Sequence, residues 1–194
     1  DGVKKDLAAD KEVLAHPEKY YDRVIEINLS QVEPAINGPM SPDAMMPLSD
    51  VAKIAKEKGF PTQLEVALIG SCTNSSYEDI TRAASVAKQI VEKGIEFKTP
   101  LLVVPGSVRI YETLKRDGVL QYFEKLNATV LADTCGPCIG QWKRTIGDST
   151  KPNAIIESFN RNFAGRNDGS KKTNAFLASP EIVMAMAIAG DLTF

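Results

Sequence analysis

Short apolar segments alternate with helical patterns over most of this 194-residue chain, and this alternation constrains the fold more than any other feature. Near-continuous apolar runs are typical of strands buried on both faces, and helices between such strands favour a parallel sheet. Four such strands are expected, at residues 64–69, 101–104, 129–131 and 154–157. The sequence therefore predicts an α/β fold, a three-layer αβα domain around a mainly parallel sheet.

The segments between these strands carry the spacing and the end signals of helices. Apolar residues recur on one face from Ile80 to Val91, and Gly94 ends the pattern, so one helix is expected after the first strand. The same criteria predict four more helices, at residues 51–58, 107–117, 120–126 and 181–189.

The first 60 residues are less regular. Residues 24–29 alternate like a half-buried strand, whereas residues 34–47 hold four prolines, which predicts an irregular connector. We therefore expect residues 1–60 to form a connector packed on an α/β domain at residues 61–194, the two making one structural unit. Because the chain begins with Asp1 rather than Met, we also expect it to be a fragment of a longer protein.

The charge balance limits the classes of partner. The chain has 23 Lys plus Arg against 25 Asp plus Glu, so no basic excess favours nucleic acid or an anionic membrane. The longest apolar run, at residues 182–189, is shorter than the roughly 20 residues that a membrane span needs. We expect a soluble protein from a reducing compartment, with no nucleic-acid or membrane partner.

Three cysteines, Cys72, Cys135 and Cys138, lie in loop-like segments that follow predicted strands. The carboxyl ends of parallel strands meet at one edge of a sheet, where ligands bind. Three thiols leave either an odd reactive thiol or a metal centre with one open position. A Cys-x-x-Cys pair with one distant Cys could supply three ligands of a cubane iron–sulfur cluster. The helix expected after Cys72 would also favour a thiolate there.

Other interpretations of the cysteines stay open at this point. Cys135 and Cys138 have the spacing of a thiol–disulfide oxidoreductase, although Thr134 stands where thioredoxins carry Trp. A closed zinc site needs a fourth ligand, and the only histidine, His16, lies in a charged stretch beside Pro17, where we expect it to be solvated. Each cysteine could also be a small buried apolar residue.

A loop rich in Asn and Gly at residues 158–167 contains Arg161 and Arg166. Guanidinium groups match carboxylates, so these arginines could orient a di- or tricarboxylate. Asn160 and Asn162 could donate to a cluster sulfur or to substrate oxygen. The alternative is that both arginines are exposed surface charges. That assignment is made for Lys143, Arg144, Lys171 and Lys172.

Three long motifs resemble the aconitase family, specifically its mitochondrial type. They are residues 69–79 (IGSCTNSSYED), 135–142 (CGPCIGQW) and 158–168 (SFNRNFAGRND). The similarity extends from Tyr21 to Gly190, so nearly the whole chain resembles the third domain of an aconitase with its preceding connector.

The resemblance implies that the three cysteines hold a 4Fe–4S cluster whose open iron binds water or substrate. It also implies that Asn160 lies beside the cluster and that Arg161 and Arg166 bind the carboxylates of citrate, isocitrate and cis-aconitate. The implied activity is the reversible citrate to isocitrate isomerisation of the tricarboxylic acid cycle, a hydro-lyase reaction in the mitochondrial matrix.

The acid and base groups of that family come from other domains, so we expect no catalytic residue in this chain, and none at Asp133. The isolated fragment is predicted to be inactive, with the remaining aconitase domains as its partners in a monomeric parent enzyme. An RNA-binding aconitase-like protein is the last alternative, which the neutral charge disfavours.

Overall fold

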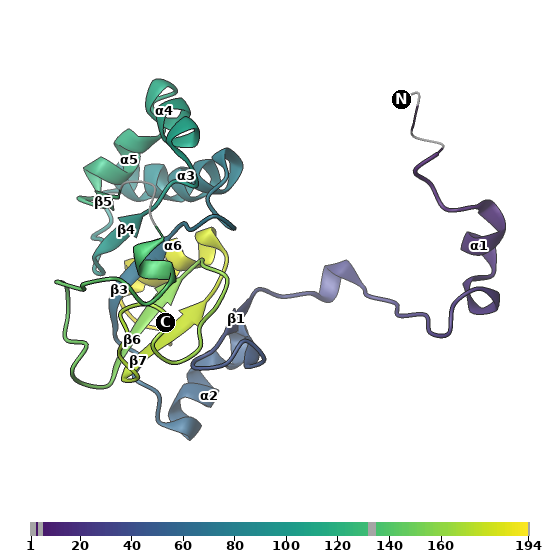
Figure 1. Cartoon of the computed structure of the whole chain (residues 1–194), viewed down its shortest axis with the longest axis horizontal. Coiled ribbons are helices and arrows are strands. Elements are labelled where there is room, and N and C mark those ends of the chain that lie inside the picture. The colour runs from purple at the N-terminus through teal and green to yellow at the C-terminus, as the bar shows by residue number, and fades with distance from the viewer. Residues whose placement is uncertain (1–2, 4–5, 132–134, 194) are drawn as a thin grey trace. The chain divides into compact units, whose positions relative to one another are not determined.

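The computed structural model describes residues 3, 6–131 and 135–193 (Figure 1). The chain divides into two compact units, Asp1–Val32 and Glu33–Phe194. No described helix combines the length and the apolar character needed to cross a membrane. The second unit contains the predicted α/β domain.

The described residues of the first unit form one short helix and two single 3₁₀ turns. They are α1 (Lys11–Ala15), η1 (Pro17–Lys19) and η2 (Leu29–Gln31). The strand predicted at residues 24–29 is wrong, because residues 24–28 form no regular element and Val24, Ile25 and Ile27 are exposed. An alternating segment becomes a strand only where a neighbouring strand pairs with it, and the described residues of this unit include no strand.

The second unit is built on a seven-stranded sheet with the order β2-β1-β7-β6-β3-β4-β5. All neighbouring strands from β7 to β5 are parallel, and the hairpin of β1 and β2 runs antiparallel at one edge. The strands are β1 (Ala35–Asn37), β2 (Met45–Pro47), β3 (Leu64–Ile69), β4 (Leu101–Val103), β5 (Thr129–Val130), β6 (Asn153–Glu157) and β7 (Thr173–Leu177).

The helices match the predicted segments closely. They are α2 (Val51–Lys58), α3 (Tyr77–Lys93), α4 (Val108–Arg116), α5 (Leu120–Lys125) and α6 (Pro180–Ala189), with 3₁₀ turns η3 (Leu48–Asp50) and η4 (Gly136–Cys138). Glycines in the left-handed conformation end α2, α3 and α6, at Gly59, Gly94 and Gly190. The end signals in the sequence therefore predicted the boundaries correctly.

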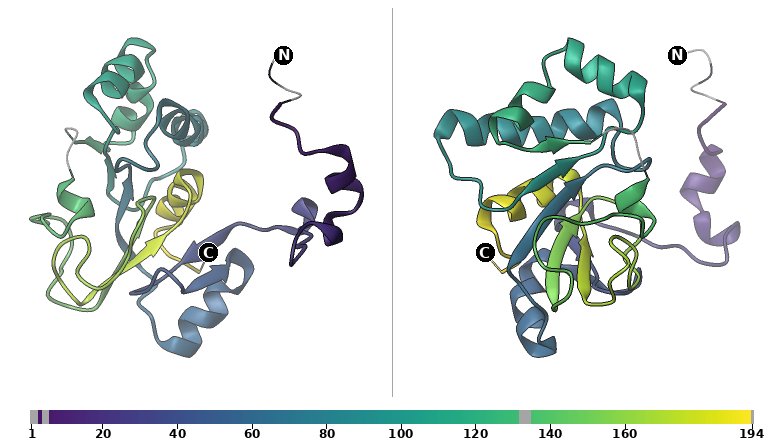
Figure 2. Two further views of the ribbon diagram at one scale, coloured as in Figure 1. Left: turned by 45° about the vertical axis from the view of Figure 1, so that its right-hand side comes forward. Right: turned by 60° about the vertical axis from the view of Figure 1, so that its left-hand side comes forward.

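The two faces of the sheet bury different side chains. Along β3, Ala67 and Ile69 join a large cluster that also contains residues of α2, α3, α5 and α6, and Figure 2 shows these helices around the strands. Val66 and Leu68 alternate with them and join a smaller cluster that includes Cys138 and the loop residue Phe159. The α/β class with a mainly parallel sheet and flanking helices is confirmed.

Two features of the sheet were not predicted. The proline-rich segment contains the β1–β2 hairpin, with Ile36 and Met46 in the core. β7 was missed entirely, although it pairs with β6 along five residues. Residues 33–60 thus contribute two strands and a helix to the second unit, and the expected domain division at residue 60 stays a prediction.

Candidate functional site

The loops that carry the predicted site residues all follow parallel strands. Residues 70–76 follow β3, the described residues 131 and 135–138 come after β5, and residues 158–163 follow β6. Because β6, β3, β4 and β5 are parallel neighbours, these loops leave the same edge of the sheet. Asp133 and Thr134 lie outside the described residues.

The loop around Cys72 is held by the end of β6. Gly70 has φ +144°, and its amide donates to Ser158 Oγ at 3.0 Å. Asn74 Nδ2 donates to the Ser158 carbonyl at 2.6 Å. Ser158 is fully buried, whereas Cys72 is exposed. The sheet thus fixes the loop on both sides of Cys72 and leaves the thiol accessible.

The helix α3 begins after this loop with a cap of its own. Ser76 Oγ accepts from the Asp79 amide, and Asp79 Oδ2 accepts from the Ser76 amide at 3.1 Å. This capping box satisfies amides at the start of the helix. The sequence predicted that this helix terminus favours a thiolate at Cys72. In the structure, Ser76 and Asp79 cap the terminus.

Cys135 and Cys138 lie at the two ends of a tight turn. The Cys138 amide donates to the Cys135 carbonyl at 2.9 Å, and η4 runs from Gly136 to Cys138 itself. Cys135 is exposed, whereas Cys138 is buried within the smaller apolar cluster. All three cysteines are free thiols.

Asn160 connects the loop of Cys72 with Cys138. Its Nδ2 donates to Thr73 Oγ1 at 3.3 Å, and Thr73 Oγ1 lies 3.7 Å from Cys72 Sγ. On its other side, Asn160 Oδ1 accepts from Cys138 Sγ at 3.7 Å. A chain of polar contacts therefore runs from one predicted cysteine to another through the asparagine that the sequence singled out.

The two predicted arginines lie differently. Arg166 Nη2 donates to Cys138 Sγ at 3.3 Å and to Asn160 Oδ1 at 3.4 Å, and its guanidinium lies over the Phe163 ring. Arg161 is exposed and donates to the carbonyl of its neighbour Asn160 at 2.7 Å. The structure thus brings Arg166 to the sulfur and leaves the Arg161 side chain facing solvent.

Among residues 3, 6–131 and 135–193, no three His, Cys, Asp or Glu side chains are grouped closely enough to share one metal ion. The exposed His16 lies beside Glu18. The thiolates of a cubane cluster each bind a different iron, so they need not share one ion. Free thiols on adjoining loops suit such a cluster.

Two buried residues near the cysteine turn, Glu157 and Asn167, were not singled out as site residues from the sequence. Glu157 ends β6 fully buried, and its Oε2 accepts from Asn167 Nδ2. Burial raises the pKa of Glu157 well above 4.5, although Asn167 and the charge of Arg166 oppose the shift. A carboxylate at the end of an apolar strand was the available signal in the sequence.

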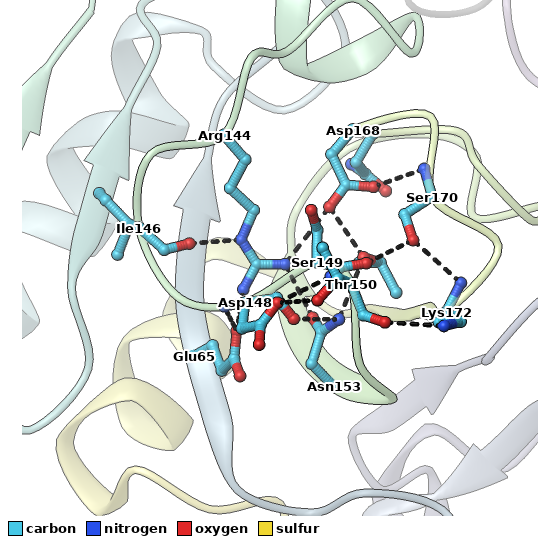
Figure 3. Close-up of polar contacts among 12 residues, drawn as sticks. Glu65, Arg144, Ile146, Asp148, Ser149, Thr150, Asn153, Asp168, Ser170 and Lys172 are labelled. Atoms are coloured by element: carbon cyan, nitrogen blue, oxygen red, sulfur yellow. Dashed lines mark hydrogen bonds and ion pairs between the residues drawn. The ribbon is translucent and has the colours of Figure 1, made fainter.

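The prediction that Arg144 is an exposed surface charge is wrong. Its side chain is 1% exposed and forms ion pairs with Glu65 and with Asp168, the latter at 3.3 Å (Figure 3). It also donates to Asn153 Oδ1 at 2.7 Å and to the Ile146 carbonyl at 2.6 Å. Arg144 therefore fastens its own loop to the start of β3 and to the loop that follows Arg166 and Asn167.

The other three residues of that assignment, Lys143, Lys171 and Lys172, are exposed as expected. Asn162 is buried instead of facing a ligand, and its Nδ2 donates to the carbonyl of Asn37 at 3.3 Å. Asn162 thus holds its loop on the β1 edge of the sheet.

The fold and these contacts define a class of protein: an α/β domain whose carboxyl sheet edge gathers free thiols, an amide and a guanidinium into one set. The sequence model of the Aconitase family (aconitate hydratase) matches residues 3–190. The chain therefore belongs to the aconitase family.

Individual relatives agree with this assignment. "Probable aconitate hydratase, mitochondrial" of Dictyostelium discoideum is 53% identical over 182 residues, which cover 94% of this chain and 24% of the relative. "Aconitate hydratase, mitochondrial" of Gracilaria gracilis is 50% identical over 194 residues, covering 100% and 24%. The Saccharomyces cerevisiae protein of the same name is 49% identical over 188 residues, covering 97% and 23%. The chain spans about a quarter of the length of these curated relatives.

Proposed function

We propose that this chain is the cluster-binding part of an aconitate hydratase, the hydro-lyase that interconverts citrate and isocitrate through cis-aconitate. The names of the relatives contain the word mitochondrial, and we propose a mitochondrial location for this chain, in the matrix. The observation that carries the proposal is the set of contacts through Asn160, which links the loop of Cys72 to Cys138 and Arg166.

Members of the aconitase family use an iron–sulfur cluster, and the residues that would hold it here are Cys72, Cys135 and Cys138. Bound to three thiolates, a 4Fe–4S cluster supplies one iron with an open position that acts as a Lewis acid on a hydroxyl group. The small residues beside each sulfur leave room for the cluster, and Asn160 would lie next to it.

The arginines of the chain would bind and orient the tricarboxylate. Arg166 is fixed by Cys138 and by the Phe163 ring, so its planar fork is held in one orientation. Arg161 is exposed, so its guanidinium is accessible to a second carboxylate. Together, the fixed guanidinium of Arg166 and the accessible guanidinium of Arg161 would favour a di- or tricarboxylate over a monocarboxylate.

The chain supplies this part of the site without a proposed acid or base. We therefore place the proton-transfer groups in the remaining domains of a monomeric parent enzyme, consistent with a chain that covers about a quarter of its relatives. General acid and base groups typically contribute 10²- to 10⁴-fold to a rate. The isolated chain should therefore show no measurable citrate–isocitrate turnover.

Anaerobic reconstitution with iron and sulfide tests the proposal. The reconstituted chain should contain about four irons and absorb visible light, yet give no turnover. Insulin reduction by the iron-free chain would instead support the thiol–disulfide alternative of Cys135 and Cys138. Tight, salt-sensitive RNA binding would support the RNA-binding alternative.

A further inference from the structure

The side chain of Asn167 lies between the sheet and the turn that carries two of the cysteines. Its Nδ2 donates to the Pro137 carbonyl at 3.0 Å and to the Glu157 carboxyl. Its main-chain carbonyl accepts from the Trp142 amide at 3.4 Å. One residue thus binds the cysteine turn in its middle and again on its carboxyl side.

These contacts are shielded from solvent. Asn167 is 2% exposed, and Pro137 and Cys138 are buried as well. Proline has no amide hydrogen, so the carbonyl of Pro137 is the only main-chain polar group through which it can be held. A buried donor or acceptor that loses its partner costs more than an exposed one, because water does not replace it. The bond from Asn167 therefore restrains the turn strongly.

Glu157 gives Asn167 a rigid support. It lies within β6, where its neighbours in the sheet are Leu68 of β3 and Leu177 of β7. Within the described part of the chain, Glu157 Oε1 has no hydrogen-bond partner, so the bond from Asn167 to Oε2 is the principal one that this carboxyl makes. The orientation of the Asn167 amide is thereby tied to the sheet.

The loop of Asn167 and the cysteine turn are in close contact along their backbones. A Cβ added at Gly140, which has φ +76°, would lie 3.1 Å from the Gly165 carbonyl oxygen. Arg166, in the same loop, donates to Cys138 Sγ at 3.3 Å. Any displacement of this loop would therefore move the backbone anchor and the sulfur contact together.

We propose that Asn167 is a positioning residue that fastens the Cys135–Cys138 turn to the end of β6 and keeps the Cys138 sulfur buried beside Asn160 and Arg166. The inference rests on the proposed function in one respect, since it takes this turn as the source of two cluster ligands. Asn167 itself contacts neither a thiol nor the substrate in this role.

Alkylation of Cys138 in the iron-free chain tests the proposal directly. Iodoacetamide is added to the folded chain, and the modified peptides of Cys135 and Cys138 are followed by mass spectrometry. In the unaltered chain, Cys138 should react more slowly than Cys135. Asn167→Ala should accelerate the alkylation of Cys138 by about tenfold, because a buried hydrogen bond no longer opposes local opening of the turn.

Asn174→Ala is the matched control. Asn174 is a half-buried asparagine of β7, and its Nδ2 donates to the Asn153 carbonyl at 3.0 Å and to the Lys172 carbonyl at 3.3 Å. Neither bond reaches the cysteine turn or the loop of Asn167, so Cys138 alkylation should stay within about twofold of the unaltered rate. Equal acceleration by both variants would mean a general loosening of the fold and would overturn the proposal.

Further variants distinguish loss of the Asn167 hydrogen bonds from loss of the folded structure. Glu157→Gln keeps an oxygen that can accept from Asn167, so Cys138 should remain slow to react. If Asn167→Ala does not fold, as judged by circular dichroism, Asn167→Ser replaces it, because its hydroxyl is too short to reach Pro137. Alkylation at the unaltered rate in a folded Asn167 variant would overturn the proposal.

Reconstitution of the same variants distinguishes this inference from the proposed function. Faster alkylation of Cys138 in Asn167→Ala, with no iron uptake by the unaltered chain, would support the positioning role and reject the cluster. Iron uptake by the unaltered chain, with unaltered alkylation in Asn167→Ala, would support the cluster and reject the positioning role.

Discussion

Arg166 donates a hydrogen bond from Nη2 to the sulfur of Cys138, 28 residues earlier in the chain, at 3.3 Å. The same guanidinium lies 5.3 Å from the centre of the Phe163 ring, which supports its plane. Hydrogen bonds to the sulfurs and local charge are among the factors that set the reduction potential of an iron–sulfur cluster. An arginine proposed to bind substrate is thus also positioned to tune the proposed cluster.

Arg166→Leu should therefore lower the reduction potential of the reconstituted chain. Loss of one hydrogen bond from a cation corresponds to a shift on the order of 60 mV toward more negative potential. A redox titration followed by electron paramagnetic resonance measures it. The control is Arg161→Leu, whose exposed guanidinium contacts no cysteine among its described bonds. A shift of equal size in the control would contradict the role of the Arg166–Cys138 bond.

Arg144→Met should destabilise the folded chain by about 3–5 kcal/mol, because it leaves the carboxylate of Asp168 buried without its cation. Chemical denaturation measures the loss. Lys143→Met, one residue away and exposed, should change stability by no more than about 0.5 kcal/mol. Adding Asp168→Asn to Arg144→Met should recover part of the loss, and failure to recover any would argue against the ion pair as its cause.

Gly70→Ala should cost at least about 2 kcal/mol of stability. Gly70 has φ +144°, and an added Cβ would lie 2.7 Å from Val104 Cβ. Backbone strain and steric overlap therefore both contribute to the cost. Gly59→Ala is the control, since Gly59 has φ +67° with open space around it, and about 1 kcal/mol is expected there. Equal costs at the two positions would show that Gly70 is not pressed against Val104, the residue after β4.

The pH dependence of stability should reveal Glu157. Its pKa is raised in the folded chain, so the folded state holds the proton more tightly than the unfolded state does. The contribution of Glu157 to the free energy of unfolding is fully present below pH 4.5. It is lost as pH rises above that value through the pKa of the folded state. Glu157→Gln cannot lose the proton, so it should gain stability relative to the unaltered chain as pH rises. Parallel pH profiles of the two proteins would contradict this assignment.

The main strands and helices could be predicted because their signals are local. Apolar runs mark β3 and β6, while Ser179, Pro180 and the terminal glycines mark the limits of the helices. β1 and β2 were missed because prolines mask a short hairpin at the edge of the sheet, where β1 pairs with β7. The alternation at residues 24–29 gave a wrong prediction, because the described residues of that unit include no strand to pair with it.

For the site as well, residues in local motifs could be predicted, whereas contacts between residues far apart in the sequence could not. The cysteines, Asn160 and Arg166 belong to long motifs and could be found from the sequence. Arg144 could not, because its partners Glu65 and Asp168 lie 79 and 24 residues away and only the fold brings them together. Asn167 lies within a recognised motif, yet its bond to Pro137 spans 30 residues, so its contact could not be seen.

The roles of the three cysteines are tested most directly by reconstituting Cys72→Ser, Cys135→Ser and Cys138→Ser separately under anaerobic conditions, with iron counted against protein and the visible spectrum recorded. We expect about four irons in the unaltered chain and loss of the stable cluster in every variant, with circular dichroism unchanged. A stable four-iron cluster in Cys72→Ser would contradict it, because the site would then not depend on all three thiolates.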